Sequence, residues 1–155
     1  MLPSGILEPS RISIADPASS KKRVLEKAAR LLTAAGDEEP SADQVFERLL
    51  ERERLGSTGL AGGVALPHAR IPQLKDTRGA FLRLAEGVEF DALDGEPVDL
   101  VFALLVPEEA NEEHLQLLAH LAGRFNDAAL RQRLREAEAD EALRLLLDGA
   151  PTHAA

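Results

Sequence analysis

The sequence predicts a single α/β domain, a sandwich in which helices flank a mixed β-sheet. Apolar residues recur at helical spacing both before and after a block of short apolar runs that are bounded by Gly and Pro. One of these runs, Val98–Val106, is almost wholly apolar, as is typical of a central strand covered on both faces. The 155 residues suffice for one core without covalent cross-links. We expect the domain to span residues 8–148 and a flexible tail to span 149–155.

The first elements are predicted to be a strand and a helix. Ile12-Ser13-Ile14 alternates in polarity, which favours a strand, and Asp16-Pro17 favours a turn after it. Ser19 or Ser20 can cap the helix that follows, and Gly36 is expected to end it. Apolar residues of this helix fall at helical spacing: Val24, Leu25, Ala28, Leu31 and Leu32.

A second helix is predicted to begin after Ser41 and to end at Gly56. Gln44 follows Ser41 by one helical turn, which is a capping-box arrangement. Strands and then helices are expected after it. The strands are Val64–Leu66, Gly79–Ala85 and Val98–Val106, and the helices are Asn111–Phe125, Asp127–Glu136 and Asp140–Leu147.

Composition excludes several classes of function. The formal charge of -9 argues against a nucleic-acid or anionic-membrane surface and favours a basic protein partner. The absence of cysteine excludes disulfides, thiolate zinc sites and a cysteine nucleophile. No apolar stretch is long enough to cross a bilayer, and the first residues lack the order of a signal peptide. We therefore expect a cytoplasmic protein without membrane insertion.

The most informative stretch runs from the end of the second helix through a glycine-rich turn to a Pro-His pair. Pro67 has a fixed φ and no N–H, so we expect it to end the strand and to hold His68 stiffly. Small Ala69 is expected to leave one side of the imidazole ring uncrowded. Imidazole is mostly neutral at cytoplasmic pH, because its ordinary pKa is about 6.5, and the neutral ring is a nucleophile. These features favour an imidazole that accepts a phosphoryl group.

This stretch resembles the signature of the enzyme IIA proteins of the bacterial phosphotransferase system, in the fructose, mannitol and nitrogen-regulatory class. The family pattern has an acidic residue, an aliphatic-small pair and the order aliphatic-Ala-aliphatic-Pro-His-small. Here its places hold Glu53, Leu60, Ala61, Val64, Ala65, Leu66, Pro67, His68 and Ala69. Weaker similarity extends from about Ile12 to Leu147. The stretch Glu51–Gly59 looks most like the nitrogen-regulatory subgroup.

The resemblance implies roles for three residues. His68 would carry the phosphoryl group on its more exposed ring nitrogen, with the inner nitrogen held by backbone. His114 matches the family's second histidine, which lies close to the first and helps to hold the phosphoryl group. An arginine at the spacing of Arg52 would neutralise its charge. Such a protein would accept the group from a small phosphocarrier resembling HPr.

The residues themselves leave alternatives for two of these roles. Asn111 is expected to cap its helix, so His114 would lie in the first turn, where the helix dipole attracts anions. The alternative is an ordinary surface histidine at a helix start. Arg52 continues the helix edge made by Val45 and Leu49, but a solvated arginine at a helix end would fit the same spacing.

The remaining histidines are not expected to join the site. His120 is turned away from His114 on the same helix, and His153 lies in the expected tail.

Other chemistries find less support. The turn Gly56–Gly63 lacks the Lys-Ser/Thr ending of a phosphate-binding loop and dinucleotide spacing, although Ser57 and Thr58 offer hydroxyls near the site. Zinc held by both histidines is conceivable but has no assured third ligand. The acids of Glu108–Glu113 are better explained as helix-dipole partners, or as an attraction for a basic donor, than as a metal cluster. We expect no cofactor and no metal.

Two functions from different classes fit a phosphohistidine. The protein is either a regulator of the nitrogen-type phosphotransferase system, acting on targets such as potassium-transport or sensor proteins, or the enzyme IIA component of a fructose- or mannitol-type sugar transporter. A binding module with a merely structural histidine is a more remote alternative.

Overall fold

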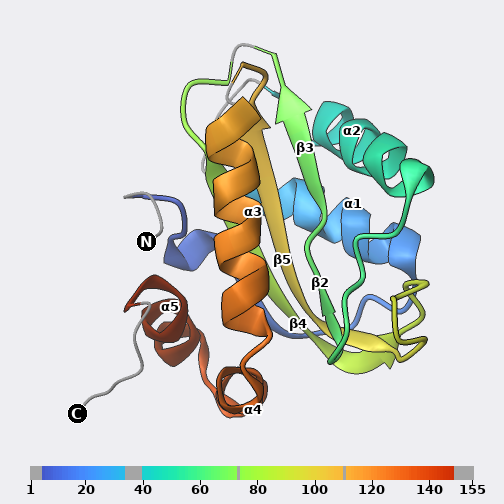
Figure 1. Cartoon of the computed structure of the whole chain (residues 1–155), viewed down its shortest axis with the longest axis vertical. Helices are drawn as coiled ribbons and strands as arrows, with labels where there is room; N and C mark the ends of the chain where they lie inside the picture. Colours follow the sequence, from blue (N-terminus) through green and yellow to red (C-terminus); the bar gives the residue numbers. More distant parts are fainter. Residues whose placement is uncertain (1–4, 34–39, 73, 110, 149–155) are drawn as a thin grey trace.

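The computed structural model describes residues 5–33, 40–72, 74–109 and 111–148 (Figure 1). A short 3₁₀ turn, Pro9–Arg11, precedes the first strand. The strands are β1 (Ile12–Asp16), β2 (Val64–Ala65), β3 (His68–Ile71), β4 (Arg78–Val88) and β5 (Val98–Pro107). The helices are α1 (Lys21–Leu32), α2 (Ala42–Leu55), α3 (Asn111–Phe125), α4 (Ala128–Glu136) and α5 (Ala139–Asp148).

The five strands form one mixed sheet, which confirms the predicted α/β sandwich. The order is β1-β4-β5-β2, and β3 pairs with β5 beyond the end of β2. β4 and β5 are antiparallel, whereas β1 runs parallel to β4, and β2 and β3 run parallel to β5. The edge beside β5 is therefore one interrupted strand.

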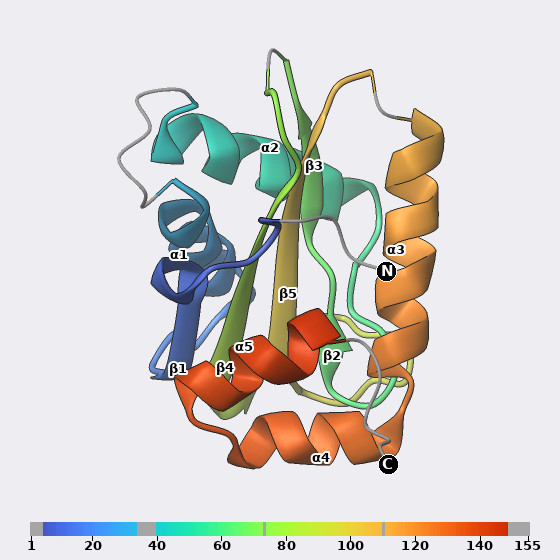
Figure 2. The same cartoon turned by 90° about the vertical axis from the view of Figure 1, so that its left-hand side faces the viewer.

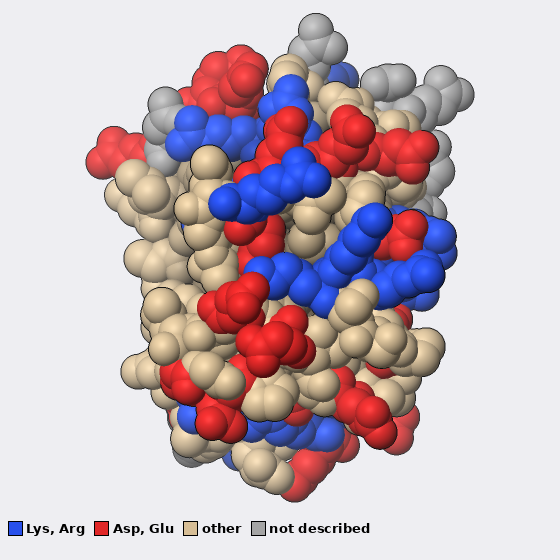
Figure 3. All heavy atoms as spheres, turned by 90° about the vertical axis from the view of Figure 1, so that its right-hand side faces the viewer, with Lys and Arg blue, Asp and Glu red and all other residues tan. Residues whose placement is uncertain are grey.

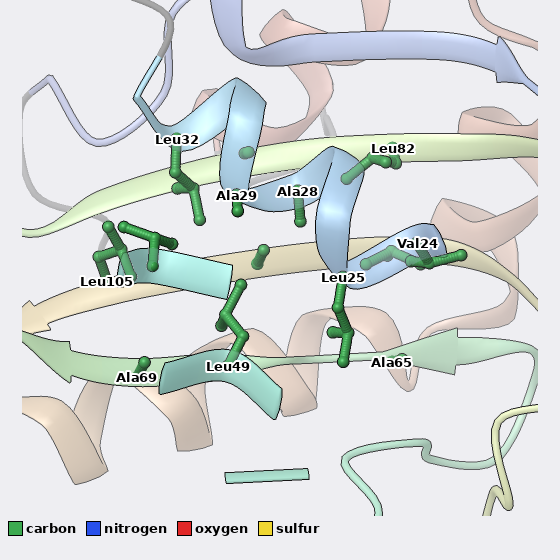
Figure 4. Close-up of a cluster of buried hydrophobic side chains, with 14 of the residues drawn as sticks. Val24, Leu25, Ala28, Ala29, Leu32, Leu49, Ala65, Ala69, Leu82 and Leu105 are labelled. Carbon is green, nitrogen blue, oxygen red and sulfur yellow. The ribbon is translucent and has the colours of Figure 1, made fainter. Parts of the chain in front are cut away.

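Helices cover both faces of the sheet (Figures 1 and 2). On one face α1 and α2 bury a cluster that includes Leu25, Leu49 and Leu105 (Figure 4). On the other face α3, α4 and α5 bury a second cluster around Phe102 and Phe125. Alternate residues of β5 belong to the two clusters, so the prediction of a central strand covered on both faces is confirmed.

The predicted helix starts hold, with small shifts. The hydroxyl of Ser20 accepts a hydrogen bond from the Arg23 N–H, and that of Ser41 accepts one from the Gln44 N–H. α1 ends at Leu32, and Gly36, where its end was expected, lies outside the described residues.

The C-terminal helices differ only slightly from expectation. α3 begins at Asn111 itself, one residue before the start that a cap at Asn111 would give. The Asp127 carboxylate caps α4 by accepting from two backbone N–H groups. The expected tail, residues 149–155, lies outside the described residues.

The expectation that the strand ends at Pro67 was incomplete, because a further strand begins at His68. The Pro67 carbonyl accepts the Leu104 N–H at 2.9 Å, and His68 then stands opposite Leu104 in register. Proline lacks the N–H that a ladder uses, so the break is confined to the Leu66–Pro67 step and pairing resumes at once. His68 therefore lies on an edge strand rather than in a loop.

Candidate active site around His68

The ring of His68 is oriented by a backbone carbonyl. Its Nδ1 lies 2.9 Å from the carbonyl oxygen of Leu66. Because a carbonyl only accepts, Nδ1 carries the hydrogen of the neutral ring and donates it. The other nitrogen, Nε2, then has no hydrogen and keeps its lone pair, which is the form a nucleophile needs.

Arg52, in the last turn of α2, reaches this second nitrogen. Its guanidinium Nε lies 3.3 Å from Nε2 of His68 and donates to it. Its Nη1 donates to the Gly56 carbonyl at 2.7 Å, which fixes the guanidinium from the other side. The half-buried arginine thus places a positive charge beside the lone pair that accepts its hydrogen bond.

His114, in the first turn of α3, packs its ring against that of His68. The two ring centroids lie 5.1 Å apart and the planes meet at 73°, an edge-to-face contact. His114 is only 6% exposed, so it is not the surface histidine of the alternative interpretation. Neither of its ring nitrogens has a hydrogen-bond partner within the described residues. A buried imidazole without hydrogen-bond partners is unusual, so its ring nitrogens are candidates for binding a ligand or a transferred group.

Both rings are neutral at neutral pH. Burial lowers the pKa of His68; the Leu66 carbonyl opposes this shift, and the charges of Arg52 and Arg70 add to it. Burial, together with His68 and the same two arginines, lowers the pKa of His114 to about 4. Loss of hydration on burial is the largest cause of the shift in the pKa of His114.

The three residues singled out from the sequence therefore lie together. They come from α2, from β3 and from α3, and meet at the edge of the sheet. Figure 3 shows the α2 side of the molecule, where Lys and Arg side chains form a band between acidic groups. Such a mixed surface differs from the uniform basic patch of a nucleic-acid site.

A buried acid, Glu53, had no assigned role in the sequence interpretation. Its carboxylate accepts from the Thr58 hydroxyl at 2.7 Å and from the Thr58 N–H at 3.0 Å. The ammonium of Lys21 lies 3.1 Å from the same carboxylate. Glu53 is the acidic place of the motif, and that was the available signal for its importance.

The structure corrects the expectation for Ala69 and specifies the one for Ser57 and Thr58. The hydroxyls of Ser57 and Thr58 face backbone and Glu53 rather than the histidine rings, since Ser57 donates to the Phe90 carbonyl at 2.6 Å. The side chain of Ala69 belongs to the cluster under α1 and α2 (Figure 4). Successive side chains of a strand point to opposite faces, so it lies on the opposite side of β3 from the His68 ring. A small residue is therefore required there by helix packing.

The glycine-rich turn has a structural explanation. Gly62 and Gly63 have φ of 84° and 81°, which favours glycine. The turn folds back so that the Thr58 carbonyl accepts the Leu66 N–H at 3.1 Å.

Among residues 5–33, 40–72, 74–109 and 111–148, no group of three His, Cys, Asp or Glu side chains is placed to hold a metal ion. None of the helices in these ranges is long and apolar enough to span a membrane. The half-buried ring of His120 has an Nε2 without a partner among the described residues.

Comparisons with known proteins agree with this description. The nitrogen regulatory protein of Pseudomonas aeruginosa is 50% identical over 138 residues, covering 89% of each chain. The crystal structure of nitrogen regulatory protein IIA-Ntr from Neisseria meningitidis matches with a TM-score of 0.84 at 46% identity, covering 91% of this chain and 96% of that one. A fructose-specific EIIA component of Haloferax volcanii is 35% identical, covering 88% of each chain. Residues 5–149 match the family described as phosphoenolpyruvate-dependent sugar phosphotransferase system, EIIA 2, and the chain belongs to this family.

Proposed function

We propose that His68 accepts a phosphoryl group on Nε2 from a phosphocarrier resembling HPr. The observation that carries this proposal is the Nδ1 contact to the Leu66 carbonyl, which leaves Nε2 without a hydrogen and with its lone pair toward Arg52. That lone pair attacks the phosphorus of the donor's phosphohistidine, and the breaking P–N bond returns its electron pair to the donor ring. The proton on Nδ1 stays in place throughout.

Arg52 and His114 hold the transferred group. The Arg52 N–H now directed at Nε2 passes to a phosphoryl oxygen when Nε2 forms its bond, and the guanidinium offsets the added charge. The neutral His114 ring, whose nitrogens have no partner within the described residues, supplies one further donor. Catalysis of this kind rests on positioning and charge rather than on covalent chemistry by many residues.

The protein acts as a regulator of the nitrogen-type phosphotransferase system in the cytoplasm. The 50% identity with a nitrogen regulatory protein along almost the whole chain supports this choice. A phosphate at His68 adds negative charge beside Arg52, so it changes which proteins bind there. Targets of this kind include potassium-transport and sensor proteins.

The second candidate function is sugar transport. It is favoured by the 35% identity with a fructose-specific EIIA component, which also spans almost the whole chain. In that case the phosphoryl group passes from His68 to a sugar-permease domain rather than remaining as a signal.

Both candidate functions require phosphorylation of His68, and a measurement of phosphate uptake tests this step. Incubation with phosphoenolpyruvate, enzyme I and the carrier should give one acid-labile, alkali-stable phosphate per chain. His68→Ala should take up none, and His120→Ala, the matched histidine outside the site, should behave as wild type. Uptake by His68→Ala at the wild-type rate would refute the assignment.

A paired experiment separates regulation from transport. Wild type, His68→Ala and His68→Asp are used to recover partners from lysate, and sugar phosphorylation is assayed with membranes. The regulator is expected to differ between its two states by about 5- to 150-fold in affinity for a partner that is not a permease. Rapid, His68-dependent formation of fructose or mannitol phosphate without such a partner would establish transport instead.

A further inference from the structure

We propose that Glu53 is a positioning residue for phosphoryl transfer, which orients His68 and Arg52 through the backbone of the glycine-rich turn. The inference rests on the proposed function of His68. Glu53 touches neither His68 nor the path of the phosphoryl group. Its charge raises the pKa of His68 from a distance, whereas its positioning effect passes through other groups. Four observations carry it: the burial of its carboxylate, its bonds to Thr58, the link from Thr58 to His68, and the link from Glu53 to Arg52.

The carboxylate of Glu53 is buried and fully engaged. Its side chain is 3% exposed, and burying a charge is costly unless the charge is paired and hydrogen-bonded. Oε1 accepts from the Thr58 hydroxyl, and Oε2 accepts from the Thr58 N–H and from Lys21, at 2.7, 3.0 and 3.1 Å. The Glu53 carboxylate therefore holds Thr58 through both its side chain and its backbone.

A continuous series of hydrogen bonds leads from Thr58 to the histidine. The Thr58 carbonyl accepts the Leu66 N–H at 3.1 Å. The Leu66 carbonyl in turn lies 2.9 Å from Nδ1 of His68, and this contact selects the tautomer. A shift of Thr58 would move Leu66, and with it the carbonyl that keeps the hydrogen on Nδ1.

A second, shorter link leads from Glu53 to the arginine. The Glu53 carbonyl accepts the Gly56 N–H at 3.2 Å, and the Gly56 carbonyl accepts from Arg52 Nη1 at 2.7 Å. Arg52 and Glu53 are neighbours in the last turn of α2, so one residue anchors the helix end that carries the guanidinium. This link uses the backbone carbonyl of Glu53, which every variant keeps, so the carboxylate affects Arg52 only by holding the helix end to which both residues belong.

Lys21 extends the anchor to the rest of the domain. Its ammonium also contacts Asp91 at 3.1 Å and lies 5.2 Å from the centre of the Phe90 ring. It stands at the start of α1, so the ion pair ties α1, α2 and the loop after β4 to one point.

The test uses variants that separate shape from charge. Glu53→Ala removes all carboxylate contacts, and Glu53→Gln keeps the shape but loses the charge. Thr58→Val removes only the hydroxyl, and Thr58→Ser keeps it. Glu51→Gln, an exposed acid on the same helix, is the matched control. Single-turnover phosphorylation by the phosphorylated carrier is measured over a range of carrier concentrations, which gives a saturating rate and a half-saturating concentration.

Glu53→Ala is expected to lower the saturating rate by about 10- to 100-fold, the effect of a small misplacement of reacting groups. The half-saturating concentration should stay within about twofold, because docking of the carrier is untouched. Thr58→Val should lose roughly 3- to 10-fold, while Thr58→Ser and Glu51→Gln match wild type. A wild-type saturating rate in both Glu53→Ala and Thr58→Val would overturn the inference. If Glu53→Ala does not fold, Thr58→Val against Thr58→Ser decides.

A readout independent of transfer separates this inference from the proposed function. Nitrogen NMR of the imidazole should report a single Nδ1–H tautomer of His68 in wild type and in Thr58→Ser. Thr58→Val and Glu53→Gln should show a mixture of tautomers. If wild type takes up no phosphate, the proposed function fails, and the tautomer alone then decides whether Glu53 positions His68. An unchanged tautomer in both variants would overturn that positioning.

Discussion

Arg52 and His68 meet at the edge of the sheet, with the guanidinium Nε 3.3 Å from the ring Nε2. Arg52 belongs to α2, which packs on one face, whereas the His68 ring contacts His114 of α3 on the other. β3 is an edge strand, so side chains from helices on the two faces of the sheet can meet beside it without a further strand between them. The nitrogen proposed to react is therefore enclosed by groups from both layers.

Replacing Arg52 should slow phosphoryl acceptance. Lysine keeps the charge but loses the planar set of donors, and alanine loses both. We expect roughly a 10-fold loss of rate for Arg52→Lys and 100-fold for Arg52→Ala, the size of one lost electrostatic donor. Arg54→Ala, exposed and two residues further on, is the control. Equal rates in all of these variants would assign Arg52 to the solvated helix end.

The His68 ring should titrate below its ordinary range. Its lowered pKa means that the ring gains a proton only when the pH falls below about 6.5. NMR titration should therefore place the midpoint under 6.5. Since the Arg52 charge contributes to the lowering, Arg52→Gln should move the midpoint upward, and Arg54→Gln should not. A wild-type midpoint at or above 6.5 would contradict this.

His114 should make the protein sensitive to acid. Its pKa is about 4 in the folded state, whereas the unfolded ring keeps its ordinary pKa of 6.5. Between these values the unfolded chain binds the extra proton, so stability falls as the pH decreases from 6.5 toward 4. Between pH 7 and pH 5, His114 should lower the free energy of unfolding by about 2 kcal/mol.

The test is urea unfolding of wild type and His114→Gln at both pH values. The variant lacks the titrating ring, so its loss should be smaller by that amount. An equal loss of stability in both proteins would show that the pKa of His114 is the same in the folded and the unfolded state.

The side chain at position 69 should affect the stability of the fold rather than the surroundings of the His68 ring. A larger side chain there would enter the cluster shared with Leu49, and overpacking typically costs about 1–3 kcal/mol. Ala69→Leu should therefore lower the free energy of unfolding while the His68 tautomer stays the same. A stable Ala69→Leu protein that accepts no phosphate would restore the steric explanation for this position.

The layers were predictable because their signals are local. The apolar run of β5, the helical spacing in α1 and the serine caps each depend on residues close in sequence. The start of β3 was not predictable, because proline ends a strand in most contexts and only the register with β5 restores it. Ala69 was misread for the same reason, since its face depends on that strand.

Only the resemblance to the enzyme IIA family predicted that three residues meet at one site: Arg52, His68 and His114. Their roles remain a proposal. The burial of His114 was not predictable, because a helix start is exposed unless another layer covers it. The Lys21–Glu53–Asp91 contacts were also beyond reach, since they join three segments that only the fold brings together.

The central claim is that Nε2 of His68 is the nucleophile, and the position of the phosphate tests it most directly. The protein labelled with nitrogen-15 in histidine is phosphorylated by the carrier and examined by nitrogen and phosphorus NMR. The contact between Nδ1 and the Leu66 carbonyl predicts a phosphorus–nitrogen coupling to Nε2 of His68, with the hydrogen retained on Nδ1. Phosphate on Nδ1, or on any residue other than His68, would contradict it.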